Sequence, residues 1–295
     1  MAIPGADPIV VAPTPTPFHT DDSIDFDALG RNVERWMKTP LSGFVLGTAN
    51  GEELALSEEE KAQTVRVVRD ACDGQRLVVA GVDCPSVAET LHRAERFASA
   101  GADLVRVRVP KGTTPLAVES YLAQVTARAP VPIVVIHQTF DGVPAAPADV
   151  LGALVGLDNV FGYITDHDVR FEAAVRLHAP KDRRFWICNG GLLLFGALFG
   201  ANGACMWLGN VMPSLCMDIM RLGVEQRFAE ARPMQETATR LDSAIARHGV
   251  AGVKAALDML GFEGMRTRAP RPELGRAGRE EARAALLEAK LLTSV

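Results

Sequence analysis

Seven titratable side chains lie in or just beyond short apolar runs of the sequence, where buried strands would deliver them to a common site. They are Asp83, Arg106, Arg108, His137, Asp166, His167 and Asp168. Because imidazole titrates near neutral pH, His137 and His167 are candidate general acid–base groups, with the carboxyl of Asp166 beside them. The sequence thus predicts a site of proton transfer with these three residues as its catalytic candidates.

The two arginines suggest a negatively charged substrate. Arg106 and Arg108 are two residues apart in one predicted strand, so their side chains would share a face. A guanidinium can bind a carboxylate through two parallel hydrogen bonds, which makes Arg108 a candidate substrate-binding residue. Alternatively, inward-facing arginines could simply pair with Asp83.

The string "DHD" at 166–168, together with His137, could also hold a divalent metal that polarises a carbonyl group. Its spacing matches no known ligand pattern, however, and an aspartate that opens a helix is equally an N-terminal cap. We therefore expect no metal and no other cofactor.

A glycine-bracketed loop, "GTANGEE" at 47–53, could bind an anion through its backbone. Glycines on both sides of small polar residues let successive N–H groups point the same way and form a nest for a carboxylate. The candidate residues are Thr48, Ala49 and Asn50. A plain turn between a strand and a helix is an equally good interpretation of this loop.

Eight short β-branched runs must position these groups. They are residues 8–13, 43–47, 76–82, 103–109, 132–137, 160–164, 184–189 and 203–209, and amphipathic helical patterns separate most of them. One of these helices should begin at Ser57, which forms a capping-box pattern with Glu60. Strands separated by single helices must run parallel, and eight such units predict an α/β fold, a (β/α)8 TIM barrel, with its active site at the C-terminal strand ends.

Strand patterns disappear after about residue 212, where all further periodic segments are helical. The stretch at 265–278, rich in proline, arginine and glycine, is predicted as a loop. We expect a barrel over 1–228 and a C-terminal helical extension of the same domain over 229–295.

Composition narrows the class of partner. The net charge of −5 and the pI near 5.7 provide no basic surface for nucleic acid. Five scattered cysteines without a CxxC pair indicate reduced thiols, and the N-terminus lacks the basic region of a signal peptide. The longest apolar stretch, 190–209, is interrupted by glycines and predicts a buried helix and strand, not a membrane span. A cytoplasmic protein is expected.

Several motifs in order resemble the dihydrodipicolinate synthase/N-acetylneuraminate lyase family. They are "PTPTPFHTDDSIDFDAL" at 13–29, "GTANGEELALSEEEK" at 47–61, "PIVV" in the fifth strand, "NGG" at 189–191 and "GVKAALDMLG" at 252–261. The resemblance implies a barrel with a helical tail, a homodimer or homotetramer, and a 2-oxo acid substrate bound through a lysine imine. It also places Asn189 and Gly190 at the substrate, and the carboxylate on the loop at 47–53.

The chain departs from this family at its two catalytic positions. Ile136 stands where the family has a proton-shuttling tyrosine, and Ile164 stands where it has the imine-forming lysine. Isoleucine cannot form an imine, and the aromatic pair after the fourth strand is missing as well. Lys111 is the lysine expected nearest the mouth, and it is a candidate for a relocated imine.

Two functions remain open. One is a lyase or hydro-lyase on a small 2-oxo carboxylate that uses His137, His167 and Asp166 in place of an imine. The other is a non-catalytic homologue that binds a carboxylate or serves as a subunit in an oligomer.

Overall fold

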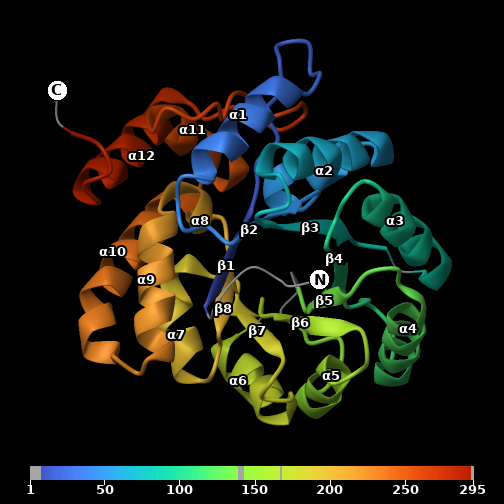
Figure 1. Cartoon of the computed structure of the whole chain (residues 1–295). Coiled ribbons are helices and arrows are strands. Elements are labelled where there is room, and N and C mark those ends of the chain that lie inside the picture. Colours follow the sequence, from blue (N-terminus) through green and yellow to red (C-terminus); the bar gives the residue numbers. More distant parts are fainter. Residues whose placement is uncertain (1–7, 85, 139–142, 167, 294–295) are drawn as a thin grey trace.

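The computed structural model describes residues 8–84, 86–138, 143–166 and 168–293, and its centre is a closed barrel of parallel strands (Figure 1). The strands follow one another around the barrel in chain order, as predicted. They are β1 (Ile9–Pro13), β2 (Gly43–Leu46), β3 (Leu77–Val82), β4 (Leu104–Arg108), β5 (Ile133–Ile136), β6 (Val160–Ile164), β7 (Arg184–Ile187) and β8 (Gly203–Cys205).

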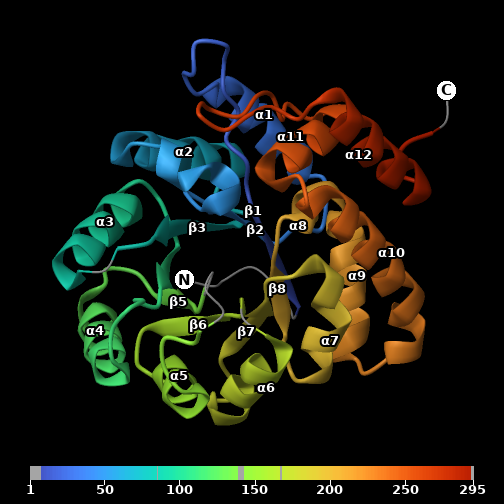
Figure 2. The same ribbon diagram turned by 180° about the vertical axis from the view of Figure 1, so that it is seen from behind.

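Helices surround the barrel, as the views from the two sides show (Figures 1 and 2). In the barrel region they are α1 (Phe26–Trp36), α2 (Glu58–Cys72), α3 (Val87–Ser99), α4 (Pro115–Arg128), α5 (Ala148–Val155), α6 (Val169–His178), α7 (Leu193–Leu198), α8 (Leu208–Val211) and α9 (Pro213–Val224). The predicted capping box is present at α2, because Ser57 and Glu60 exchange backbone–side-chain hydrogen bonds of 3.2 and 2.8 Å.

The C-terminal extension packs on one side of the barrel. It consists of α10 (Phe228–Ala246), α11 (Gly249–Met259) and α12 (Arg276–Glu288), with α10 against α9 and α12 against both α10 and α11. The loop predicted at 265–278 is present over 265–275, but its last three residues already belong to α12. Within the described residues, none of the helices is long and apolar enough to cross a membrane.

The predicted eighth strand is wrong in its second half. Strand β8 ends at Cys205, and Leu208 already begins α8. Both parts of this apolar stretch are buried, and a short buried helix cannot be distinguished from a short buried strand by periodicity alone.

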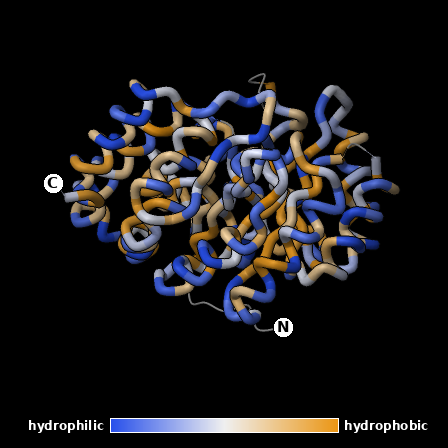
Figure 3. The backbone as a smooth tube through the Cα atoms, turned by 90° about the horizontal axis from the view of Figure 1, so that it is seen from above, coloured by the Kyte–Doolittle hydropathy of each residue, from blue (hydrophilic) through white to orange (hydrophobic). Residues whose placement is uncertain are grey.

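Both faces of the strands are buried, because one face lines the barrel interior and the other contacts the helices. The interior cluster contains Val11, Val45, Val79, Ile136 and Ile164 among others, and a separate, larger cluster includes the strand residues that pack against the helices. Figure 3 shows hydrophobic segments gathered inside the molecule and hydrophilic ones along much of its rim. The alternation determines which side chains enter the mouth of the barrel.

Candidate active site at the mouth of the barrel

Ile136 and Ile164, which the resemblance places where catalytic side chains are expected, form part of the apolar interior of the barrel. They are 3% and 0% exposed and belong to one hydrophobic cluster with Trp186. They also face each other in the register of β5 and β6. The barrel interior just below the mouth is therefore apolar at β5 and β6. Because side chains alternate along a strand, those two residues further on point into the mouth.

Asp166 lies two residues beyond Ile164 and is the acid–base candidate that reaches the mouth. Burial raises the pKa of its carboxyl from 3.8 to about 6, although a hydrogen bond with Gln138 and the positive charges of Arg106, Arg108 and Lys111 act in the opposite direction. The backbone N–H of Asp166 donates to Glu172 Oε1 at 3.0 Å, which fixes the start of the loop. A carboxyl with this pKa can accept and return a proton near neutral pH.

His137 points toward the helix layer and not into the mouth of the barrel. The expectation that it is a general acid–base group is therefore not supported. Its ring is 1% exposed and lies 5.2 Å from the ring of Phe171 in α6, between the barrel and the helix layer. Its Nε2 accepts a hydrogen bond of 3.0 Å from the backbone N–H of Ala145. Because Ile136 points inward, its neighbour His137 points outward.

The remainder of the "DHD" string favours the capping interpretation. Asp168 accepts hydrogen bonds from the backbone N–H groups of Arg170 and Phe171, at 3.0 and 3.2 Å, and so caps α6. His167 lies outside the described residues. Among the residues that the structure describes, no group of three His, Cys, Asp or Glu side chains is arranged to hold a metal ion.

The two arginines of β4 bind acidic side chains, which confirms the alternative of pairing with Asp83. Arg106 and Arg108 both reach Asp83 Oδ2, the latter at 3.1 Å, and Arg108 also lies 3.2 Å from Glu53 Oε1. Burial and the adjacent Asp83 raise the pKa of Glu53, while the two arginines oppose the change. Two carboxyls and two guanidiniums thus form one compact network along the β2–β4 side of the mouth.

The loop at 47–53 is folded into tight turns. Gly47 and Glu52 have positive φ angles of 62° and 61°, and between them Ala49–Gly51 forms a 3₁₀ turn, η1. The N–H groups of Gly51 and Glu53 donate to Thr48 O at 2.8 and 3.2 Å. The amides of Ala49 and Asn50 head this turn and have no acceptor within it, so they are the stronger nest candidates, while Thr48 is buried.

A buried ion pair joins this loop to the C-terminal extension. Lys254 Nζ lies 2.6 Å from Glu52 Oε1 and donates to Arg266 O at 2.6 Å, above the ring of Phe18. Burial lowers the pKa of Lys254 from 10.5 to about 8, against the attraction of Glu52. The sequence indicated Lys254 only as part of the motif at 252–261. A lysine flanked on both sides by apolar residues, in "GVKAAL", is the signal that could have revealed a buried partner.

Asn189 and Gly190 have different surroundings. Asn189 lines a small cavity of about 70 Å³ together with Asp166 and Cys188, so this part of the substrate-site prediction lies beside the acid–base candidate. Its side chain accepts from Gly191 N–H at 2.8 Å. Gly190 is buried, and a Cβ there would come within 2.8 Å of Asp242 Oδ1, so close packing accounts for this glycine.

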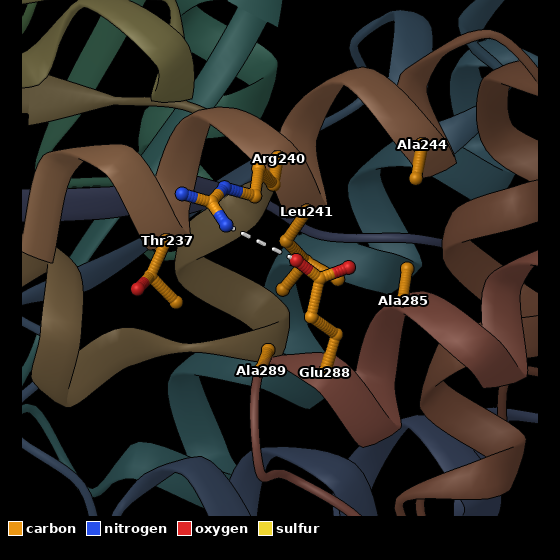
Figure 4. A pocket seen from close by; sticks show the side chains of 7 residues that line it. All are labelled: Thr237, Arg240, Leu241, Ala244, Ala285, Glu288 and Ala289. Carbon is orange, nitrogen blue, oxygen red and sulfur yellow. Dashed lines mark hydrogen bonds and ion pairs between the residues drawn. The ribbon is translucent and has the colours of Figure 1, made fainter.

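A larger pocket of about 660 Å³ opens beside the mouth. The loop at 49–55 and Arg108 form one side and the loop at 268–272 forms the other. The sequence predicted the second segment only as a connecting loop, so its contribution to the pocket was missed. A cavity of about 120 Å³ lies between α10 and α12, where Arg240 and Glu288 form an ion pair of 3.3 Å (Figure 4), and none of the mouth residues lines it.

Comparison with known proteins agrees with this architecture. The model of the dihydrodipicolinate synthetase family matches residues 8–289. An uncharacterised DapA-like lyase of Halobacterium salinarum is 32% identical over 269 residues, 88% of this chain and 87% of that protein. An L-threo-3-deoxy-hexylosonate aldolase of Hypocrea jecorina is 27% identical over 309 residues, 98% and 96% of the two chains.

The fold is also that of a solved relative. The 4-hydroxy-tetrahydrodipicolinate synthase of Methylacidiphilum fumariolicum superposes with a TM-score of 0.87 at 24% identity, over 95% of each chain. With the family model spanning almost the whole sequence, the chain belongs to the dihydrodipicolinate synthetase family.

Proposed function

We propose that this protein is a lyase or hydro-lyase acting on a small 2-oxo carboxylate, without an imine at the sixth strand. The observation that carries the proposal is Asp166, a carboxyl at the mouth whose pKa is raised to about 6 by burial. Relatives named as a lyase and an aldolase support the same reaction class. We assign to Asp166 the acid–base role that was expected of His137, and His167 stays a candidate beside it.

In a carbon–carbon cleavage, ionised Asp166 would take the proton of a hydroxyl group on C4 of a 2-oxo acid. The C3–C4 bond would break, its electron pair would pass to the 2-oxo oxygen, and an aldehyde would leave. Asp166 would then return its proton to C3 of the resulting enolate. The positive charges that act on Asp166, those of Arg106, Arg108 and Lys111, would also stabilise the enolate.

The substrate carboxylate would bind at the turn formed by residues 48–51. The amides of Ala49 and Asn50 provide donors there, and Arg108, which lines the adjoining pocket, provides positive charge. Asn189, which shares a cavity with Asp166, would contact the reacting end of the substrate. These residues give the substrate one fixed orientation in front of the acid–base group.

The replaced positions support a mechanism without an imine. Ile164 is wholly buried in the barrel interior, and Lys254, the lysine with a lowered pKa, is held by Glu52 and a backbone carbonyl. Lys111 is exposed after β4 and remains the candidate for a relocated imine. Borohydride reduction in the presence of pyruvate, followed by mass spectrometry, should leave no adduct; a stable adduct mapped to Lys111 would refute this part of the proposal.

A non-catalytic carboxylate-binding homologue is the second candidate, because the resemblance implies that Ile136 and Ile164 replace both catalytic side chains of the family. An assay distinguishes the two functions. Purified protein is incubated with a panel of 4-hydroxy-2-oxo acids, and pyruvate release is followed with a coupled dehydrogenase. We expect turnover that Asp166→Asn reduces about 10²-fold or more, as for a lost acid–base group. Exposed Asp158→Asn is the matched control. Binding without turnover would favour the second candidate.

We also propose a homodimer or homotetramer in the cytoplasm. The apolar residues near the end of the chain do not offer an interface, because Leu286 is buried and Leu291 and Leu292 pack on the core. Large exposed apolar side chains instead include Leu54 and Leu116 near the mouth and Phe195 and Leu198 on α7, besides others such as Leu177 on α6. None of the five cysteines forms a disulfide, which supports a reducing compartment.

A further inference from the structure

The 660 Å³ pocket beside the mouth is lined by three arginines, Arg108, Arg268 and Arg271. Two of them already have acidic partners. Arg108 lies 3.2 Å from Glu53 and 3.1 Å from Asp83, within the network of two carboxyls and two guanidiniums. Arg268 binds both oxygens of Glu60 at 2.7 and 3.0 Å.

Arg271 differs from both. Its nearest carboxylate oxygen is Glu52 Oε2, 3.7 Å from its Nε. That carboxylate is already compensated by Lys254 at 2.6 Å and accepts the backbone N–H of Arg268 at 3.0 Å. Within the described residues, the acidic groups that line the pocket thus have other cationic partners. Arg271 adds a positive charge that they do not balance.

Hydrogen bonds fix the main chain at Arg271 before any ligand binds, while its side chain is 48% exposed. Thr267 Oγ1 shares its single hydroxyl hydrogen between the carbonyls of Arg271 and Pro272, each at 3.1 Å, and Arg271 N–H donates to Arg268 O at 3.1 Å. The Arg268 guanidinium in turn anchors this loop to Asp22 O and Ala55 O. Such an arrangement leaves little conformational entropy to be lost in the loop on binding.

We propose that Arg271 is a specificity-determining residue that binds a second, distal anionic group of the substrate in this pocket. The substrate would then be a 2-oxo acid with a terminal carboxylate or phosphate, held at one end by the turn at 48–51 and at the other by Arg271. This inference rests on the proposed function for the position of the first carboxylate.

The test is calorimetric binding of a matched pair of ligands, 2-oxoglutarate and 2-oxovalerate, which have the same chain length and differ in the terminal carboxylate. The wild type should bind 2-oxoglutarate about tenfold more tightly, the effect of one partly exposed charge-assisted contact. Arg271→Gln should abolish the difference without weakening 2-oxovalerate binding, and Arg271→Lys should restore part of it. The control is Arg276→Gln, a nearby arginine whose side chain is 93% exposed and paired with Glu280.

A parallel titration with 3-phosphoglycerate tests a phosphate in place of the distal carboxylate; a loss of its binding in Arg271→Gln also supports the proposal. The proposal would be overturned by equal affinities for 2-oxoglutarate and 2-oxovalerate, together with no effect of Arg271→Gln on the binding of 2-oxoglutarate or 3-phosphoglycerate. So would an equal loss of affinity for both members of the pair. If monocarboxylates bind and the second charge brings no gain, this inference alone fails. If no 2-oxo acid binds, the proposed function fails with it.

Discussion

The replacement Asp166→Asn should stabilise the protein at neutral pH while it removes activity. The folded pKa of about 6 exceeds the ordinary 3.8 because the ionised carboxyl is buried. Between these two values the folded chain therefore binds more protons than the unfolded chain. By linkage, stability decreases as the pH rises through this range, and the penalty is fully present above about pH 6.

The size of the effect follows from the two pKa values. A change from 3.8 to about 6 corresponds to about 3 kcal/mol at neutral pH, since one pH unit is worth 1.36 kcal/mol. Because Asp166 keeps some contact with solvent, we expect about 2 kcal/mol from the neutral amide. For a chain of this length, that gain corresponds to a rise in melting temperature of roughly 3–4 °C.

The assay is thermal and urea unfolding of the wild type and Asp166→Asn at pH 7.5 and pH 4.5. At pH 4.5 the folded carboxyl is mostly protonated, so the gain should shrink to about a third of its value at pH 7.5. The exposed Asp158→Asn should change stability little at either pH. A variant less stable than the wild type at pH 7.5, or a gain independent of pH, would refute the buried-charge argument.

Four further outcomes are expected. If ionised Asp166 is the base, kcat should fall as the pH drops below about 6, and a profile flat from pH 5 to 8 would contradict this role. Lys254→Met should cost about 3–5 kcal/mol in urea unfolding because it leaves the buried Glu52 carboxylate without its main partner, whereas exposed Lys290→Met should be neutral. His137→Gln should lower stability yet leave the pH profile of activity unchanged, and a shifted profile would restore its catalytic role. Phe195→Asp should dissociate the oligomer in light scattering, if α7 forms an interface.

The amino-acid sequence by itself was enough to predict the barrel. The alternation of short β-branched runs with amphipathic helices is a local signal, and parallel strands joined by helices have few ways to close. It also located the strand ends that form the mouth, and therefore Asp166, Arg108 and the loop at 47–53. The capping box at Ser57 is another local pattern that the structure confirms.

Which side chains of each strand face the interior was decided only by the tertiary structure. In a barrel both faces of a strand are buried and apolar, so "PIVVIH" has no polar–apolar alternation from which to determine that Ile136 points inward and His137 outward. Sequence spacing likewise could not pair Glu52 with Lys254, or bring Arg271 to the rim of the mouth, because these contacts join segments about 200 residues apart. Such contacts form when the C-terminal extension packs on the barrel, and no local pattern encodes them.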